Sequence, residues 1–355
     1  MKIAKFVKKL FQSINIKYTL NNRKKYWRKI FKKNIDKSTK LSKIQIKEIK
    51  NYYSEYCKIN TLFHDFYYQK TGLYSKYYIP DDLYYTKIDP FYNNWEEAYY
   101  LDNKCYYDKL FSNVPQPKTI LKRMNDIYYD KDNNIIDKNQ AFKIVKNKNN
   151  YFLKKATDSE GGHGVFYIKK YEDFVNNISK IKTDLIVQES LSQCSELNKL
   201  HDNSINTIRV LSLISNNKVH IVSTILRMGI GDSKVDNASS GGITCGINKS
   251  GRLKEIAYAS NGKSYTRHPT SNVSFGDIII PNYDKIIKLV EKLAITMPHF
   301  RLVSWDIAIN SDNNPILVEA NLRYGELDFH QLNNGPLFGD MTDLILKEVF
   351  KGDER

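Results

Sequence analysis

The sequence predicts an α+β fold with much antiparallel sheet. From about residue 117 onward, short strand-like apolar runs alternate with longer segments of helical periodicity. Turn-forming residues separate several of the strand-like runs, which favours hairpins, and no internal repeat is visible. With 355 residues, 41% of them apolar, the chain can bury more than one small core. We therefore expect two or three subdomains.

The pattern places individual elements along this part of the chain. A short helix is expected after Leu101, ended by the turn that contains Pro115 and Pro117, and longer helices are expected at 171–181 and 283–297. Strands are predicted at 118–124, 151–156, 164–170, 184–190, 207–214, 219–228, 302–309 and 315–321.

Positive charge is concentrated in the first 50 residues. They hold 17 Lys and Arg against two acids, so they carry +15 of the formal charge of +16. The positive charge therefore belongs to an N-terminal tail, and the rest of the chain is close to neutral. Stretches such as YYSEYCKIN could stack on nucleic-acid bases, but Lys, Asn, Ile and Tyr are abundant throughout. We therefore expect no nucleic acid partner.

The tail begins with an amphipathic pattern. In residues 1–14, six apolar residues follow the spacing of one helix face, and four lysines occupy other positions. This pattern is typical of a helix that lies in a membrane interface with its lysines near anionic headgroups. The alternative is a helix docked on the protein's own core. The further basic run RKKYWRKIFKK favours the membrane interpretation.

Other signals narrow the class of protein. No run of 18 apolar residues and no secretory signal pattern occurs, so we expect a cytoplasmic protein that is peripheral at the inner membrane face. Four cysteines without a C-x-x-C spacing and seven histidines without H-E-x-x-H predict free thiols and no zinc.

A glycine-rich loop follows a lysine-bearing strand in KKATDSEGGHGVF. Gly161, Gly162 and Gly164 stand between two strand-like runs, which indicates a hairpin rather than a P-loop or a dinucleotide-binding turn. A glycine hairpin can bring backbone N–H groups close to phosphate oxygens, and Lys155 could neutralise them. A glycine-rich surface turn with solvated lysines is the alternative.

Two carboxylates are expected to meet on a second hairpin. Residues 302–321 read as two strands around the turn at 312–315. Closure there places Asp306 opposite Glu319 to within one residue, with Asn321 on the same face. Hard oxygen ligands that converge in this way suit Mg²⁺. The alternative is a pair of solvent-facing acids on an edge hairpin.

The lysine-bearing strand, the glycine hairpin, the IVQES strand and the terminal D…E-x-N hairpin resemble the ATP-grasp superfamily in order and spacing. LDNKCYYDKLF, SINTIRV, LRMGIGDSKVDNASSGGI, VSWDIAI and LVEANLRYGELDFHQ are similar to the sugar-transfer-associated ATP-grasp proteins over about residues 60–350. The resemblance implies two α+β subdomains that clasp ATP. The expected parts are a basic helical extension at 1–55, a preceding region at 56–116, a lid at 117–192 and a C-terminal subdomain at 193–355.

The resemblance also implies roles for residues of the nucleotide site. The phosphates would be contacted by Lys104 and Lys155, with 161–164 as a flap. The chain departs from relatives at Lys155-Ala156, where many have Lys-Pro, so Lys154 is a rival for the phosphate role. The hinge strand beside adenine would comprise Gln188, Glu189, Ser190 and Leu191, with Glu196 at the ribose.

For chemistry, the resemblance implies Asp306, Glu319 and Asn321 as Mg²⁺ ligands. Arg209 and Arg227 would be catalytic cations for the γ-phosphate or an acyl phosphate, although a structural salt bridge fits either nearly as well. The implied substrate contacts are Asp236, Asn237, Gly241, Gly242 and Arg323.

The resemblance thus implies an ATP-dependent carboxylate–amine ligase that uses ATP and Mg²⁺ and produces ADP. The substrates would be an amino acid or related acid and a sugar of a surface glycan precursor. Two alternatives stay open: a sugar or small-molecule kinase on the same scaffold, and a non-catalytic basic membrane or nucleic-acid-binding module.

Overall fold

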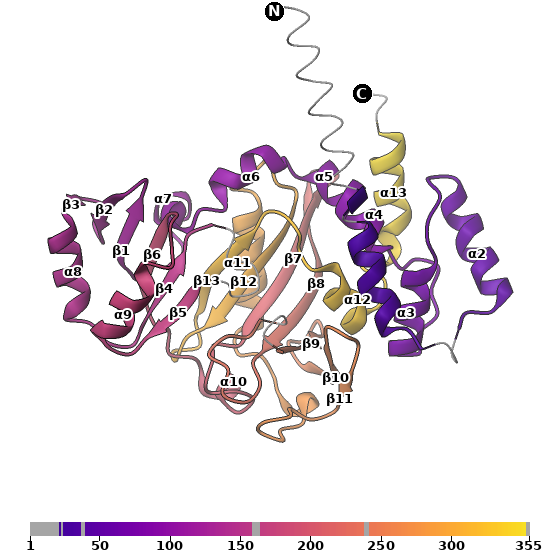
Figure 1. Cartoon of the computed structure of the whole chain (residues 1–355). Coiled ribbons are helices and arrows are strands. Elements are labelled where there is room, and N and C mark those ends of the chain that lie inside the picture. The colour runs from indigo at the N-terminus through magenta and orange to yellow at the C-terminus, as the bar shows by residue number, and fades with distance from the viewer. Residues whose placement is uncertain (1–20, 23, 37–39, 158–163, 238–240, 353–355) are drawn as a thin grey trace, which may run out of the picture. The chain divides into compact units, whose positions relative to one another are not determined.

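The computed structural model describes residues 21–22, 24–36, 40–157, 164–237 and 241–352 (Figure 1). The chain forms two compact units. The first, here the helical unit, comprises Met1–Tyr92, Asn261–Lys263 and Glu326–Arg355. The second, here the sheet unit, comprises Asn93–Ser260 and Ser264–Gly325.

Helices make up the helical unit. Besides a helical stretch at 24–34, its elements are α2 (Lys43–Ser54), α3 (Leu62–Thr71), α4 (Asp81–Leu83), the π-helix η1 (Tyr84–Ile88), α5 (Asp89–Tyr92), α12 (Leu327–Asn334), η6 (Gly339–Met341) and α13 (Thr342–Lys351). A capping box starts α2, because Ser42 and Gln45 satisfy each other's backbone N–H groups. None of the described helices combines the length and the apolar run that a bilayer span requires.

Aromatic side chains dock the 24–34 helix onto the core of its own unit. Trp27 stacks on Tyr85 with ring centroids 4.7 Å apart, and Phe31 lies 4.5 Å from the ring of Phe66. Arg28 pairs with Asp82 at 2.6 Å. The 24–34 helix is therefore docked on the core of its own unit. The amphipathic stretch 1–14 lies outside the described residues.

A six-stranded antiparallel sheet forms the first half of the sheet unit. Its strand order is β3-β2-β1-β6-β4-β5. The strands are β1 (Thr119–Met124), β2 (Ile127–Asp130), β3 (Ile135–Ile136), β4 (Tyr151–Lys155), β5 (Val165–Ile168) and β6 (Leu185–Glu189). Helices α8 (Lys138–Lys146) and α9 (Tyr171–Ile178) pack on it through a shared apolar core (Figure 1).

A seven-stranded antiparallel sheet forms the second half, in the order β11-β10-β9-β8-β7-β12-β13. The strands are β7 (Thr207–Ser215), β8 (Lys218–Met228), β9 (Ile243–Ile247), β10 (Leu253–Ala259), β11 (Ser264–Tyr265), β12 (Leu302–Ile309) and β13 (Pro315–Asn321). The helical segments are α6 (Trp95–Leu101), η2 (Lys104–Tyr106), α7 (Tyr107–Leu110), α10 (Ser195–Asn198), η5 (Phe275–Asp277) and α11 (Tyr283–Ala294).

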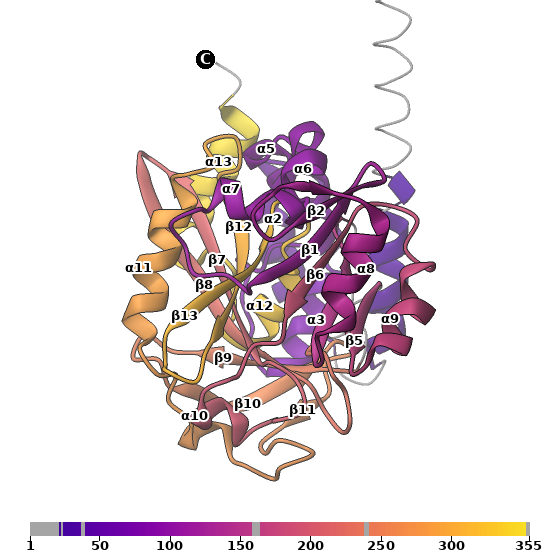
Figure 2. The same ribbon diagram turned by 90° about the vertical axis from the view of Figure 1, so that its left-hand side faces the viewer.

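Helix α11 covers one face of the seven-stranded sheet (Figure 2). Its buried residues Ile286, Val290 and Leu293 follow the i, i+4, i+7 spacing of one helix face. They share a core with Trp305, which is fully buried. The predicted helices at 171–181 and 283–297 and the predicted α+β fold with antiparallel sheets are confirmed.

Candidate active site

The β12–β13 hairpin positions the two predicted carboxylates. Asp306 pairs directly with Glu319 across the strands, which confirms the expected register. Its neighbour Trp305 points into the core, where its indole N–H donates to Ser212 Oγ at 2.8 Å. Because successive side chains of a strand point to opposite faces, Asp306 lies on the other face of the sheet.

Two arginines from neighbouring strands hold Asp306. Arg209 Nε and Nη2 donate to its two carboxylate oxygens at 2.7 Å each, and Arg227 Nη1 donates to Oδ2 at 3.0 Å. Asn321 Nδ2 donates to the same Oδ2 at 3.3 Å. Burial alone would raise the pKa of Asp306, but the two guanidinium groups lower it to about 2. Asp306 is thus ionised and fully paired.

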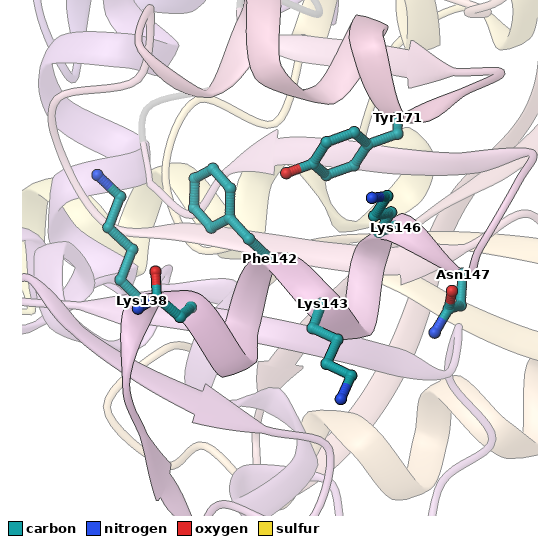
Figure 3. A pocket seen from close by; sticks show the side chains of 7 residues that line it. Lys138, Phe142, Lys143, Lys146, Asn147 and Tyr171 are labelled. Carbon is teal, nitrogen blue, oxygen red and sulfur yellow. The ribbon is translucent and has the colours of Figure 1, made fainter.

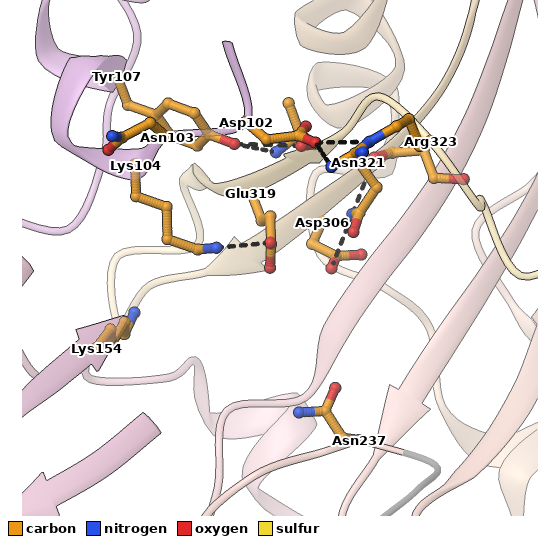
Figure 4. A network of polar contacts seen from close by, with 12 residues as sticks. Asp102, Asn103, Lys104, Tyr107, Lys154, Asn237, Asp306, Glu319, Asn321 and Arg323 are labelled. Atoms are coloured by element: carbon orange, nitrogen blue, oxygen red, sulfur yellow. Dashed lines mark hydrogen bonds and ion pairs between the residues drawn. The ribbon is translucent and has the colours of Figure 1, made fainter. Parts of the chain in front are cut away.

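Glu319 has a different partner, Lys104, although it faces Asp306. Lys104 Nζ donates to Glu319 Oε1 at 2.7 Å (Figure 4). Lys104 itself is buried, and its backbone N–H donates to Ala156 O at 3.0 Å. The segment is anchored again three residues later, because Tyr107 Oη bonds to Ala320. Lys104 therefore joins the end of β4 to the carboxylate hairpin.

Lys154, rather than Lys155, lies beside this pair. Tyr151 and Leu153 point into the α8–α9 core, so Lys154 lies on the opposite face of β4. Its Nζ donates to Gln188 Oε1 at 3.1 Å. Burial, followed by the nearby charge of Lys104, lowers the pKa of Lys154 to about 8, against the opposing effect of Glu319.

The glycine loop meets Lys155 instead. Lys155 donates its backbone N–H to Gly164 O at 2.8 Å, and a Cβ at Gly164 would lie 3.0 Å from the Cβ of Lys155. Gly164 has a positive φ of 77°, which favours glycine. Strands β4 and β5 pair on either side, so the predicted hairpin is confirmed. Gly161 and Gly162 lie outside the described residues.

The predicted hinge residues differ in burial and in hydrogen-bond partners. Gln188 is buried and accepts from Lys154, whereas Glu189 is half-buried and pairs with Lys148 at 3.3 Å. Ser190 Oγ is buried without a hydrogen-bond partner in the described part of the chain, and Leu191 is half-buried. Glu196 pairs with Lys199 at 2.5 Å. Of these five hinge and ribose candidates, Gln188 contacts a lysine of the candidate site, Lys154.

The predicted substrate loop contacts Arg227, one of the two arginines that bind Asp306. Asp236 accepts hydrogen bonds from Thr207, and Arg227 Nη2 donates to the side-chain oxygen of Asn237. Burial raises the pKa of Asp236, while Arg227 opposes this shift. Gly241 has a φ of 90°, and a Cβ at Gly242 would lie only 2.5 Å from Asp236 O, so the loop requires glycine at both positions.

Arg323, two residues after Asn321, is bound by Asp102, a residue for which no role was predicted. Nε and Nη2 of Arg323 donate to Asp102 Oδ2 at 3.3 and 3.1 Å (Figure 4). Burial raises the pKa of Asp102 to about 6, although Arg323 opposes the shift. Asp102 belongs to the LDNKCYYDKLF stretch, so the family resemblance was the one signal that could have pointed to it.

A family model for sugar-transfer associated ATP-grasp proteins matches residues 84–344. The chain belongs to this family. The match confirms the predicted ATP-grasp fold and includes every residue of the candidate site. No curated protein matches the chain.

Solved structures with similarity to this ATP-grasp protein include three ligases or synthases. An L-amino acid ligase from Bacillus licheniformis is 13% identical, with a TM-score of 0.42 over 72% of this chain and 48% of that one. N5-carboxyaminoimidazole synthase from Aspergillus clavatus, with ADP and 5-aminoimidazole ribonucleotide, is 13% identical, with a TM-score of 0.38 over 69% and 56%.

The third, the ATP-grasp ligase PsnB complexed with a minimal precursor, is 13% identical, with a TM-score of 0.42 over 72% and 64%. The chain thus spans about half to two thirds of the length of these proteins. Because all three TM-scores lie below 0.5, the family assignment rests on the family model.

The oxygen donors of this ATP-grasp site fit Mg²⁺ unequally. Asp306, Glu319 and Asn321 offer carboxylate and carboxamide oxygens, which are hard ligands. Glu319 keeps 31% of its side chain exposed and uses one oxygen for Lys104, whereas Asp306 is 4% exposed and has both oxygens bound by arginines. Within the described ranges, no group of three or more His, Cys, Asp or Glu side chains could hold a metal. Of the two carboxylates, Glu319 is therefore the more open to a metal ion.

Proposed function

We propose that this protein is an ATP-dependent carboxylate–amine ligase that forms an amide through an acyl phosphate. A substrate carboxylate oxygen attacks the γ-phosphorus of ATP and ADP leaves; an amine then attacks the acyl carbon, phosphate leaves and the amine loses a proton. The acid is an amino acid or related acid. The amine belongs to a sugar of a cell-surface polysaccharide or glycan precursor, in keeping with the sugar-transfer association of the family.

The observation that carries the proposal is an excess of cations around Glu319. Both Lys104 and Lys154 interact with the charge of Glu319. Lys104 donates a hydrogen bond to it, whereas Lys154 donates to the neutral amide of Gln188. An anion placed beside a partly buried lysine raises its lowered pKa and stabilises its charged form. Phosphate oxygens of ATP would supply that anion, and Lys154 would take the phosphate role that the resemblance gave to Lys155.

The surrounding residues would orient the reactants. Gln188, which holds Lys154, lies on the strand proposed to offer backbone groups to adenine, with 189–191 and Glu196 following it. Mg²⁺, held by Glu319, Asn321 and Asp306, would offset the charge that builds up on the transferring phosphoryl group.

The substrates would lie beside the arginines. Arg227 contacts both Asp306 and Asn237, so it connects the proposed metal ligands to the substrate loop. Arg323, positioned by Asp102, would attract the anionic acid by its positive charge. No side chain needs to form a covalent intermediate, because positioning and electrostatic stabilisation suffice for phosphoryl transfer.

The proposed reaction takes place at the cytoplasmic face of a membrane. The amphipathic pattern of residues 1–14 and the charge of +15 in the first 50 residues support this setting.

An ADP-release screen with glycan precursors from cell extracts, Mg²⁺ and each amino acid in turn tests the proposal. We expect ADP release that needs one particular acid, and a precursor whose mass increases by that acid less water. The Glu319→Gln variant serves as the inactive control. A precursor that gains a phosphoryl group would instead make the protein a kinase.

A further inference from the structure

The described part of the basic segment places its lysines on outward helix faces. On the 24–34 helix, Lys25, Lys29, Lys32 and Lys33 are exposed, whereas Trp27 and Phe31 pack inward. The lysine spacing of i, i+4, i+7 and i+8 puts all four on one side of the helix. This side carries charge but no large apolar stripe, because Phe31 is buried and Trp27 stacks on Tyr85.

Helix α2 repeats the arrangement. Its exposed lysines are Lys43, Lys47 and Lys50, at i, i+4 and i+7, and its buried residues are Ile49 and Tyr53. Lys40, just before the helix, is exposed as well.

Little negative charge balances these eight lysines. None of them forms an ion pair with another described residue. The acids within 21–50 are Asp36 and Glu48, and Glu48 is already paired with Lys76 at 3.3 Å. Lysines that fold into fixed positions without acidic partners indicate a surface for an anionic partner.

We propose that the exposed lysines of the 24–34 helix and of α2 form an electrostatic contact surface for the headgroups of an anionic membrane. The inference rests on the membrane setting proposed above and specifies how the contact is made. The 24–34 helix stays folded on its own unit and does not insert, since Phe31 is buried and Trp27 stacks on Tyr85.

Apolar side chains among the lysines favour a lipid surface over a nucleic acid. Ile44 is 81% exposed between Lys43 and Lys47, and Tyr26 is 59% exposed beside Lys25. An aromatic or aliphatic side chain beside cations suits the headgroup region of a bilayer. A nucleic acid offers no apolar phase for Ile44.

Co-sedimentation of the full chain with phosphatidylcholine vesicles, with and without phosphatidylglycerol, tests the inference. We expect binding only with phosphatidylglycerol, weakened by added salt. The triple reversals Lys25→Glu/Lys29→Glu/Lys33→Glu and Lys43→Glu/Lys47→Glu/Lys50→Glu should each weaken binding at least about tenfold, since each lysine near such a surface contributes about a fivefold change.

Helix α8 provides a matched control. Lys138, Lys143 and Lys146 line a surface hollow of about 600 Å³ with Phe142 and Tyr171, in the sheet unit (Figure 3). Reversing these three lysines changes the net charge by the same amount and should leave vesicle binding unchanged. Equal losses of vesicle binding in the α8 control and in the two triple reversals of the 24–34 helix and of α2 would overturn the inference. Wild-type binding by both of these triple reversals would overturn it as well.

Two further readouts separate the alternatives. Binding of a single-stranded RNA homopolymer that outcompetes the vesicles would overturn the inference in favour of a nucleic acid. ADP release in solution should be unchanged in the triple reversals of the 24–34 helix and of α2, because these lysines lie outside the candidate active site. A wild-type protein that binds vesicles but never forms ADP would contradict the proposed ligase activity and leave the contact surface standing.

Discussion

Lys154 Nζ lies 3.1 Å from Gln188 Oε1, on the face of β4 that also meets the Lys104–Glu319 pair. Lys155, the next residue, contacts the glycine hairpin at Gly164 instead. The two lysines therefore have different environments, and the proposed phosphate role falls to Lys154 because it lies beside the Lys104–Glu319 pair.

Replacing these lysines should separate their roles. Lys154→Met should reduce the rate of ADP formation by about a hundredfold, a loss of about 2.7 kcal/mol of transition-state stabilisation, because a charge near the transferring group is removed. Lys155→Met should have the smaller effect, and steady-state kinetics of ADP release would compare the two. A larger loss in Lys155→Met would restore Lys155 as the phosphate ligand.

The low pKa of Lys154 predicts proton uptake when ATP binds. Without ATP this lysine loses its proton near pH 8, whereas bound phosphates should return its pKa toward the ordinary value. At a pH just above 8, calorimetric binding of ATP in buffers of different ionisation enthalpy should thus show protons taken up. The Lys154→Met variant should show less uptake, and identical uptake in both proteins would exclude Lys154 as the source.

The same shift has a consequence for stability. Because the folded-state pKa lies below the unfolded one, the unfolded chain binds the proton more tightly between about pH 8 and the unfolded lysine pKa. The contribution of Lys154 to stability without ATP therefore rises as the pH increases through this window.

The two facing carboxylates should respond differently to neutralisation. Asp306→Asn leaves Arg209 and Arg227 buried without their shared anion, so it should lower the free energy of unfolding by about 3–5 kcal/mol as well as the activity. Glu319→Gln removes a partly exposed partner of Lys104 and should abolish Mg²⁺-dependent turnover at a much smaller cost in stability. Urea unfolding and ADP release measure the two effects.

A stable, active Glu319→Gln protein would remove Glu319 from the proposed metal site. An Asp306→Asn protein as stable as the wild type would show that the arginines find other partners.

Local pattern predicted much of the sheet unit. The alternation in VSWDIAI and the turn at 312–315 were sufficient to place Asp306 opposite Glu319 to within one residue, and the helical spacing at 283–297 identified α11. These elements have one buried face each, so their periodicity is visible in the sequence.

Contacts between distant segments could not be predicted in this way. The run YFLKKA has three consecutive apolar or aromatic residues, so it does not reveal which lysine faces the site; the packing of Leu153 on α8 and α9 decides this. Similarly, Trp27 and Phe31 belong to a basic amphipathic sequence that also fits a membrane surface, and their partners Tyr85 and Phe66 lie far along the chain. The pairing of Asp102 with Arg323 is of the same kind.

Trapping with hydroxylamine tests the central claim, that a carboxylate is activated as an acyl phosphate, most directly. The full-length protein would be incubated with ATP, Mg²⁺, hydroxylamine and the acid that supports ADP release, and the products separated by mass. We predict a hydroxamate of that acid, formed together with ADP and phosphate and without AMP. AMP as the nucleotide product, or a phosphorylated product with no hydroxamate for any acid, would contradict the claim.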